Sequence, residues 1–172
     1  LLSPATMAER FPNLSRFANE GIRFTNMHAT TPLCGPSRAC LLRGQYAHNT
    51  SIRVNDPNEP RSNGFDGGMR LYRDNGYFGN DISTWMKSAG YRTMMVGKFL
   101  HGDVVSLVPP GWDDFYSSLS ADYYGTQRFT TRTNPAGSYH TEPADAYRTA
   151  VESDNAIELI ETHAARGNNQ PF

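Results

Sequence analysis

Helix-type and strand-type apolar patterns alternate along the sequence, and this alternation limits the fold more than any other feature. Residues 80–90 predict a helix with a polar cap at its start and Gly90 as its stop. Residues 91–97 follow at once as an apolar run, which predicts a buried strand. A helix that leads directly into a buried strand is typical of α/β proteins, in which helices flank a mostly parallel sheet.

The remaining patterns predict the same class. The further elements we expect are helices at residues 12–20, 36–43 and 143–165, and a strand at residues 22–29. Residues 53–79 and 103–142 are rich in Gly, Pro, Asn and Asp, and we expect loops and turns there. A long irregular segment in a compact domain is usually functional or mobile. Residues 167–172 have the composition of an approach to another strand.

The number of strands limits what the chain can form alone. Its 172 residues suit one domain of ordinary size. Two predicted strands are too few for a self-sufficient sheet of this kind. We therefore expect residues 1–172 to be an incomplete part of a larger domain.

Composition excludes two classes of partner. The formal net charge is −1 and no basic stripe is present, so nucleic acid is not an expected partner. No apolar run approaches the ~20 residues that a membrane-spanning helix needs. Cys34 and Cys40 are too few for a disulfide framework and lack metal-site spacing, and Cys40 is expected to pack in the core.

Cys34 and Arg38 lie at the start of a predicted helix. Backbone N–H groups and the positive end of the helix dipole favour anions at such a place. Arg38 adds a fork-shaped cation one turn later, a combination that suits sulfate or phosphate. On spacing alone an alternative stays open, in which Cys34 is a small buried apolar residue and Arg38 lies on the surface.

Three sequence elements resemble one known family. Cys34-Gly35-Pro36-Ser37-Arg38 is similar to the Cys-x-Pro-Ser-Arg element of the type I sulfatases, which belong to the alkaline-phosphatase-like superfamily. Residues 90–102 resemble the family's Gly-Tyr-x-Thr…Gly-Lys stretch, at the expected distance. Residues 108–116 resemble the Gly-Trp turn of members related to N-acetylglucosamine-6-sulfatase and of bacterial arylsulfatases. The chain then resembles the N-terminal part of a sulfatase catalytic domain.

The resemblance implies a chemistry for three residues. In the family the cysteine, here Cys34, is oxidised to formylglycine, whose hydrate attacks a sulfate monoester with the help of a divalent metal, usually Ca²⁺ but also Mg²⁺. Arg38 would hold the hydrate and the metal-bound carboxylates. Lys98 would place a cation on a sulfate oxygen or on the bridging oxygen.

The resemblance places most of the metal ligands outside residues 1–172 and leaves the roles of two histidines open. Residue 34, as formylglycine, is itself a metal ligand by this resemblance, while the paired aspartates should precede Leu1 and the second acidic pair should follow Phe172. His101 follows Lys98 with a Lys-x-x-His spacing where many members have Lys-x-His, so we expect either a catalytic role or a substrate contact. His48 is a candidate for the substrate cleft, with a structural hydrogen bond as the alternative.

The resemblance also implies partners and a compartment. Cys34, Pro36, Ser37 and Arg38 would be recognised by the formylglycine-generating enzyme during maturation. The expected substrate is a sulfated small molecule or glycan, a carbohydrate or aryl sulfate. Family members are exported, which implies a secreted, periplasmic or lysosomal protein. Two rival functions stay open: a phosphonate monoester or phosphodiester hydrolase of the same superfamily, and a non-catalytic relative that binds sulfated glycans.

Overall fold

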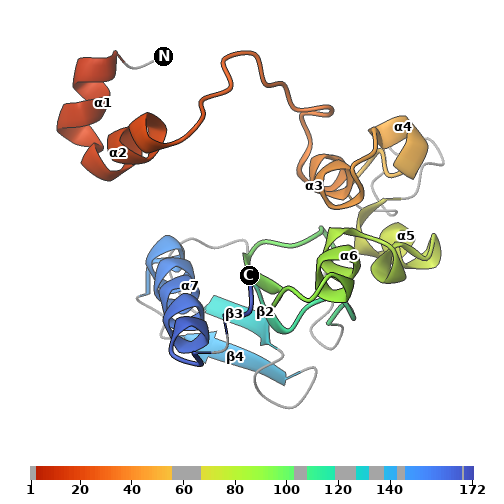
Figure 1. The fold of residues 1–172 in the computed structure, drawn as a ribbon. Coiled ribbons are helices and arrows are strands. Elements are labelled where there is room, and N and C mark those ends of the chain that lie inside the picture. Colours follow the sequence, from red (N-terminus) through yellow and green to blue (C-terminus); the bar gives the residue numbers. More distant parts are fainter. Residues whose placement is uncertain are drawn as a thin grey trace.

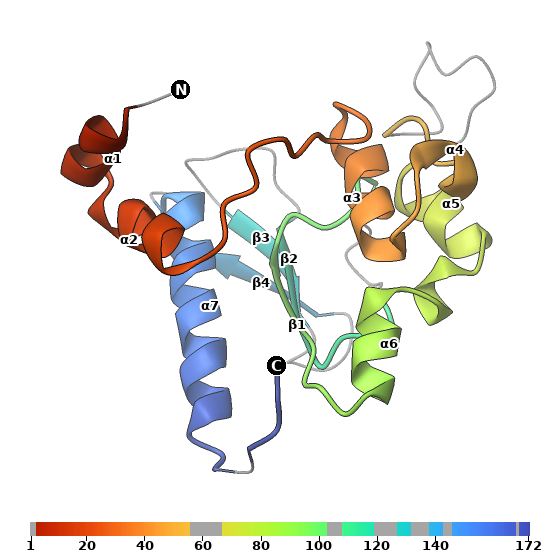
Figure 2. The same ribbon diagram turned by 45° about the horizontal axis from the view of Figure 1, so that its top comes forward.

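A four-stranded sheet with helices on both faces organises the protein (Figures 1 and 2). The structure, a computed structural model, describes residues 3–55, 67–102, 108–118, 127–131, 138–142, 146–167 and 169–172. In Figure 2, α7 (Arg148–Ala164) lies along one side of the sheet, and α3 (Cys34–Arg43) and α6 (Ile82–Ser88) lie on the other. The predicted α/β class is therefore confirmed.

The sheet has the strand order β1-β2-β3-β4. Its strands are β1 (Met94–Gly97), β2 (Asp114–Ser118), β3 (Gln127–Thr131) and β4 (Ser138–Glu142). β1 and β2 are parallel, with Met94 opposite Asp114, as expected for the predicted class. β3 and β4 extend the sheet in antiparallel pairings. The described part of the sheet thus contains the expected parallel pairing of β1 and β2, together with the antiparallel strands β3 and β4.

The three strands that follow β1 lie in the region predicted to be loops and turns. β2 reads Asp-Phe-Tyr-Ser-Ser, a polar sequence with little of the apolar alternation that marks a strand. Ser117 is nevertheless fully buried, because β2 lies between β1 and β3. Pairing with neighbours, rather than local propensity, makes this segment a strand. Residues 103–107, 119–126 and 132–137 of the same predicted region lie outside the described residues.

The predicted helices are confirmed, with shifted ends. They are α2 (Pro12–Glu20), α3, α6 and α7, and the last begins at Arg148, after residues 143–145, which lie outside the described part. Asp81 caps α6 by accepting hydrogen bonds from the backbone N–H groups of Ser83 and Thr84, at 3.1 and 3.2 Å. Gly44 ends α3 with φ 61°, a left-handed conformation that favours glycine.

The described residues also form four short helices that the sequence did not predict. They are α1 (Pro4–Arg10), α4 (Ala47–Thr50), α5 (Gly68–Asp74) and the 3-10 helix η1 (Tyr77–Gly79). α5 and η1 occupy part of the segment predicted to be irregular, of which residues 56–66 lie outside the described residues. Short helices of this kind depend on packing, because isolated helices of fewer than ~12 residues are marginal in water.

The predicted strand at residues 22–29 is not formed. The described residues 21–33 contain no helix or strand, and Figure 1 shows them as an extended connection between α2 and α3. Ile22 and Phe24, which the prediction placed on the buried face, are 86% and 74% exposed. A strand requires a neighbour for its backbone hydrogen bonds, and none of the described strands pairs with this segment. The apolar alternation is present in this segment, but none of the described strands lies beside it as a partner.

The core fills the space between β1, β2 and the helices on one face. It consists of Ala39, Ile52, Met69, Tyr72, Phe78, Phe99, Leu100, Trp112 and Phe115. Phe99 packs edge-on against both Trp112 and Phe115, with ring centroids 6.4 and 5.4 Å apart. Phe99 and Leu100 come directly after β1, so the chain at the end of this strand is anchored in the core.

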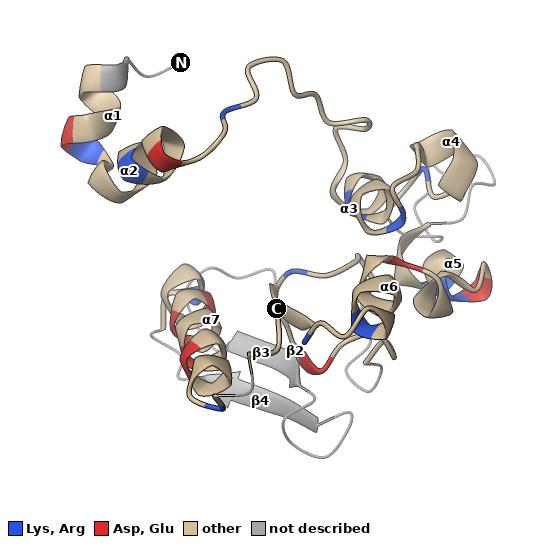
Figure 3. Cartoon of the chain, viewed as in Figure 1, with Lys and Arg blue, Asp and Glu red and all other residues tan. Residues whose placement is uncertain are grey.

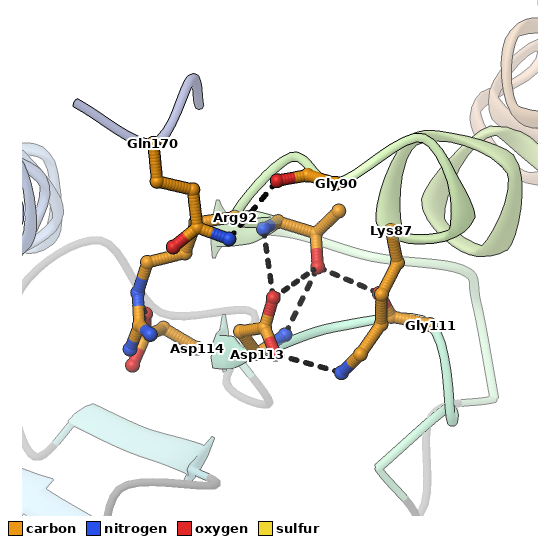
Figure 4. A network of polar contacts seen from close by, with 8 residues as sticks. Lys87, Gly90, Arg92, Gly111, Asp113, Asp114 and Gln170 are labelled. Carbon is orange, nitrogen blue, oxygen red and sulfur yellow. Dashed lines mark hydrogen bonds and ion pairs between the residues drawn. The ribbon is translucent and has the colours of Figure 1, made fainter. Parts of the chain in front are cut away.

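A polar network fixes the other end of β1 (Figure 4). Thr93 Oγ1 donates to the carbonyl of Gly111 at 2.6 Å, and Asp113 Oδ2 accepts from the Thr93 backbone N–H at 3.1 Å. Asp113 Oδ1 also pairs with Lys87 Nζ at 2.7 Å. α6, β1 and the turn before β2 are therefore held together by side chains that satisfy each other's hydrogen bonds.

The last described residues lie beside the start of β1. Gln170 Nε2 donates to the carbonyl of Gly90 at 3.0 Å (Figure 4), and the backbone N–H of Arg92 donates to the carbonyl of Pro171 at 2.8 Å. The expectation that residues 167–172 approach a strand agrees with this position, although the described residues form no strand there.

Residues of both charge signs lie along the described parts of the chain. Figure 3 shows basic and acidic residues together on α1, α2, α5 and α7, whereas α3 carries Arg and no acidic residue. None of the helices that could be searched, which are those of the described ranges, is both long and apolar enough to span a membrane.

Candidate active site

Cys34 is the first residue of α3, at the positive end of the helix dipole. Leu33 precedes the helix and its apolar side chain cannot cap the free N–H groups of the first turn. Gly35 and Pro36 are buried, whereas Cys34 is half-buried and has a free thiol. We predicted that the helix would begin near Pro36; it begins two residues earlier, so Cys34 belongs to the helix rather than to the loop before it.

Lys98 lies across from Cys34, although 64 residues separate them in sequence. Its Nζ is 3.8 Å from Cys34 Sγ. Lys98 follows β1 directly, between the buried residues Gly97 and Phe99, so its backbone is held while its ammonium group stays exposed. The site therefore lies at the carboxyl end of a parallel strand, where ligands of α/β proteins commonly bind.

Arg38 connects α3 to the same loop. One helical turn after Cys34, its Nη1 donates a hydrogen bond to the carbonyl of Phe99 at 3.2 Å. The guanidinium group is thus held by the residue that follows Lys98. Cys34, Arg38 and Lys98 form one cluster of a sulfur and two cations, which excludes the alternative in which Cys34 is buried among apolar groups and Arg38 is only a surface residue.

Asn55 is a fourth member of this cluster that the sequence did not reveal. Its Oδ1 accepts hydrogen bonds from the backbone N–H of Gly35 at 2.8 Å and from Cys34 Sγ at 3.2 Å. Asn55 lies in the segment predicted to be irregular and either functional or mobile, and that prediction was the single available signal. Asn is common in loops, so nothing distinguished Asn55 from the other Asn residues of that segment.

The pKa of the Cys34 thiol lies below its ordinary value. Burial raises this pKa, but the positive charge of Lys98, the backbone N–H of Gly35 and the charge of Arg38 together outweigh burial. The site therefore favours a negative charge at the side chain of residue 34. The same field would favour an anionic ligand beside it.

The two predicted histidines occupy different places. His101 lies in the loop after β1 that also carries Lys98, and its carbonyl accepts from the Met69 backbone N–H at 2.8 Å. His48 lies in α4, beyond the C-terminal end of α3, and its ring stacks on Tyr46 with centroids 5.7 Å apart. His101 thus lies in the same loop as Lys98, three residues further along the chain. His48 lies in another element, where its ring packs on Tyr46. The roles of both residues stay predictions.

Pro36 and Ser37, the other residues of the predicted modification motif, form the first turn of α3. Pro36 is fully buried and Ser37 is half-buried, and the Ser37 N–H closes the turn on the carbonyl of Leu33 at 2.9 Å. In the folded chain these residues therefore shape the helix start. Recognition of this motif by a modifying enzyme stays a prediction.

The described residues do not form a metal site by themselves. Within the described ranges, no three His, Cys, Asp or Glu side chains come together in a group that could hold a metal ion. The oxygen described beside Cys34 is Asn55 Oδ1, which already accepts two hydrogen bonds. Of the metal ligands that the family resemblance implies, residue 34 is the member that this part of the chain supplies.

A cavity of about 570 Å³ lies beside α3 but does not contain the cluster. It lies between the extended residues 27–30 and the helix, and Arg38 and Tyr46 are among the residues that line it. Cys34 and Lys98 do not line it. Residues 27–30, which form one wall of this cavity, are exposed and lie in the extended connection.

The sequence is similar to known proteins over nearly its whole length. A family model described as "Sulfatase" matches residues 4–172. An N-acetylglucosamine-6-O-sulfatase of Bacteroides thetaiotaomicron is 32% identical over 161 residues, which cover 94% of this chain and 24% of that protein. An extracellular sulfatase SULF-1 homolog of Drosophila melanogaster is 33% identical over 107 residues, 60% of this chain and 9% of that protein. The chain thus spans a quarter or less of these relatives.

The fold has a solved counterpart. The crystal structure of yidJ from Bacteroides fragilis superimposes with a TM-score of 0.67 at 22% sequence identity, covering 94% of this chain and 36% of that one. This likeness supports the arrangement of helices and sheet described above.

Proposed function

The chain belongs to the sulfatase family, as its resemblance to the type I members predicted, and we propose that residues 1–172 are the N-terminal part of a catalytic domain that hydrolyses sulfate monoesters. The observation that carries the proposal is the convergence of Lys98 and Arg38 on Cys34 at the start of a helix. The first strand of the domain and its C-terminal half are expected outside this chain.

Residue 34 is proposed to act after conversion to formylglycine. One hydroxyl oxygen of its hydrate attacks sulfur and displaces the alcohol of the ester. The second hydroxyl then loses its proton and collapses to the aldehyde, which breaks the C–O bond to sulfate and releases it, and water restores the hydrate. The lowered pKa of Cys34 supports this role, since the same surroundings stabilise negative charge on an oxygen at that position.

Lys98 and Arg38 are proposed to act on charge. The Lys98 ammonium is exposed and close to residue 34, so it is available to a sulfate oxygen or to the bridging oxygen as negative charge develops there. Arg38 is held by the Phe99 carbonyl, and its remaining N–H groups are available to orient the residue-34 side chain. His101 and, more distantly, His48 are proposed to contact the substrate.

A divalent cation, Ca²⁺ or Mg²⁺, is proposed as the cofactor. Oxygen ligands suit both ions, and the residue-34 hydrate provides oxygen where a thiol does not. The remaining ligands are expected from parts of the domain outside this chain. The cation would lower the pKa of the attacking hydroxyl.

The proposed substrate is a sulfated carbohydrate, with aryl sulfates as a further class. The relative from Bacteroides thetaiotaomicron is named for N-acetylglucosamine 6-O-sulfate, which supports this choice. The relative from Drosophila melanogaster is named extracellular, which supports export to a secreted, periplasmic or lysosomal location. A formylglycine-generating enzyme that recognises Cys34, Pro36, Ser37 and Arg38 is the proposed maturation partner.

Paired substrates test the proposal. The complete protein should hydrolyse a carbohydrate or aryl sulfate faster than the matched phosphonate monoester, and Cys34→Ala should abolish this turnover while leaving the fold intact. A faster rate on the phosphonate ester or on a phosphodiester would instead favour the phosphorus-ester hydrolase. Binding of sulfated glycans with no turnover, and an unconverted thiol at residue 34, would favour the non-catalytic relative.

A further inference from the structure

Asn55 reaches the start of α3 from outside the helix. Its Oδ1 lies 2.8 Å from the Gly35 backbone nitrogen and 3.2 Å from Cys34 Sγ. A backbone N–H can only donate, so the atom of the Asn55 amide that faces it must be the carbonyl oxygen rather than the amide nitrogen. The side chain of residue 34 therefore meets an acceptor on this side, and the ammonium group of Lys98 at 3.8 Å.

The backbone holds Asn55 in place. Gly68, with φ 61°, donates from its N–H to the carbonyl of Val54 at 3.2 Å. A Cβ atom on Gly67 would collide with the Val54 carbonyl, and a Cβ on Gly68 would collide with the Asn55 carbonyl. Glycine at both positions thus lets two chain segments approach closely. These contacts fix the backbone of residues 54 and 55, from which the Asn55 amide reaches the start of α3.

Gly35 leaves room for the same amide. A Cβ atom at this position would lie 2.8 Å from Asn55 Oδ1, closer than real Cβ contacts. The absence of a side chain at Gly35 therefore permits the Asn55 amide to reach both the helix N–H and the side chain of residue 34.

We propose that Asn55 is a positioning residue for residue 34, whose Oδ1 accepts a hydrogen bond from one hydroxyl of the hydrate and so directs the other hydroxyl toward the substrate. The inference rests on the proposed function, because it assigns to Asn55 a part in that reaction. In the unconverted protein the thiol occupies the place of the first hydroxyl and makes the same contact. The hydrate has two equivalent hydroxyl groups, and a fixed acceptor on one side makes them inequivalent.

A purely structural role for Asn55 predicts different behaviour. Leu33 cannot cap α3, so the acceptor that Asn55 offers to the Gly35 N–H also stabilises the helix start. Loss of that bond alone would lower the stability of the protein. It would not separate kcat from KM, and it would not move the pH profile of the reaction.

The first variant is Asn55→Ala in the complete protein, with the fraction of converted residue 34 measured by peptide mass so that kcat refers to converted sites. We expect kcat to fall by about 10- to 100-fold, the size of effect that a small misplacement of a reacting group produces, with KM within a few-fold of wild type. Asn75→Ala is the matched control, because Asn75 Nδ2 donates to the Thr50 carbonyl at 3.3 Å and makes no contact with Cys34 in the described structure. It should leave kcat unchanged.

The second variant is Asn55→Asp, which keeps an acceptor oxygen and adds a negative charge. It should restore kcat to within about 10-fold of wild type, and the charge should move the acid limb of the kcat/KM profile to higher pH by about one unit. Should Asn55→Ala fail to fold, kcat per converted site of a folded Asn55→Asp decides alone. A fall of more than about 100-fold, although the acceptor oxygen is kept, overturns the inference.

The outcomes separate the inference from the proposed function. Hydrolysis by the wild type, combined with wild-type kcat in a folded Asn55→Ala, overturns the inference and leaves the proposed function standing. If Asn55→Ala lowers kcat, raises KM and lowers thermal stability together, and Asn55→Asp restores none of them, Asn55 has a structural role. That result also overturns the inference. No sulfate ester hydrolysis by fully converted wild type contradicts the proposed function, and the inference falls with it.

Discussion

Two regions of the chain carry large apolar side chains but differ in how far these are buried. In α2 and the connection after it, Phe17 is 75% exposed and Ile22 is 86% exposed. In the region around β1 and β2, Phe99 and Phe115 are 2% and 0% exposed. The first region reaches the second through an extended connection (Figure 1), whereas the second is held by the core and by the Thr93–Asp113 network.

The difference in burial between the two regions shows what an apolar pattern can predict. Periodicity identifies the face of an element that needs a partner, and burial follows only where other elements of the same chain provide one. β1 has β2 as a parallel neighbour and α7 on one face. Residues 22–29 have no such neighbour among the described strands. We call the described residues of 34–55 and 67–115, which pack around β1, β2 and the core, the partnered region, and the candidate site lies in it.

The two regions should differ most in how far an apolar truncation lowers the stability of the protein. Phe115→Ala in the complete protein should lower the free energy of unfolding by about 3–5 kcal/mol, because it leaves a cavity among Phe99 and Trp112. Phe17→Ala should change it by about 0.5 kcal/mol or less, if Phe17 stays as exposed as it is here. Denaturant unfolding measures both. A large loss for Phe17→Ala would show that α2 is buried in the complete protein.

The two lysines of the chain provide the next comparison, both within the partnered region. Lys98→Ala should lower kcat/KM by about 100- to 1,000-fold, the cost of removing one group that stabilises developing charge. Lys87→Ala, the matched control, loses its ion pair with Asp113 and should leave kcat/KM unchanged. Steady-state kinetics on one sulfate ester checks both variants. If both variants lost kcat/KM equally, the loss would come from a disturbed fold and not from a missing charge beside residue 34.

Much of the partnered region was predictable from sequence, because its signals are local. Asp81 and Gly90 bracket α6, and Gly44 ends α3. Cys34, Arg38 and Lys98 were recognised because short motifs surround each of them, and the structure brings the three together.

What the sequence did not predict depends on contacts distant in the chain. Ser117 is buried because β2 lies between two strands, and Asn55 is placed by packing against Gly67 and Gly68. Conversely, the alternation at residues 22–29 predicted a strand, and that prediction is wrong because none of the described strands pairs with this segment. Local propensity does not record which segments meet.

A smaller effect depends on pH. Lys87 and the Thr93 N–H and hydroxyl lower the pKa of Asp113 against the opposing effect of its burial. A lowered folded-state pKa contributes stability that is fully present above the ordinary Asp pKa of 3.8 and is lost as pH falls through the folded-state value. Asp113→Asn should therefore cost about 1–2 kcal/mol near neutral pH.

The pH dependence supplies the check on that prediction. Urea unfolding of wild type and Asp113→Asn should show a difference that shrinks as pH falls below 3.8. A difference that stays constant down to the acid limit would mean that Asp113 acts through shape and not through its charge.

The smallest expected effect is in α2. Arg16 and Glu20 form an i,i+4 ion pair at 3.8 Å between side chains that are mostly exposed. Exposed pairs of this type contribute about 0.3–0.5 kcal/mol and are screened by salt. Arg16→Ala should therefore leave the unfolding free energy almost unchanged, measured at low and high salt. A clear loss would indicate that Arg16 meets another part of the complete protein.

The central claim is that residue 34 works as an oxygen-bearing carbon and not as sulfur, and peptide mass spectrometry of a catalytically active preparation tests it most directly. The account predicts that the peptide containing residue 34 is lighter than the encoded sequence by about 18 Da, the difference between a CH₂SH and a CHO group, and resists thiol alkylation. An active preparation in which residue 34 keeps its full mass and is alkylated as a thiol would contradict the account.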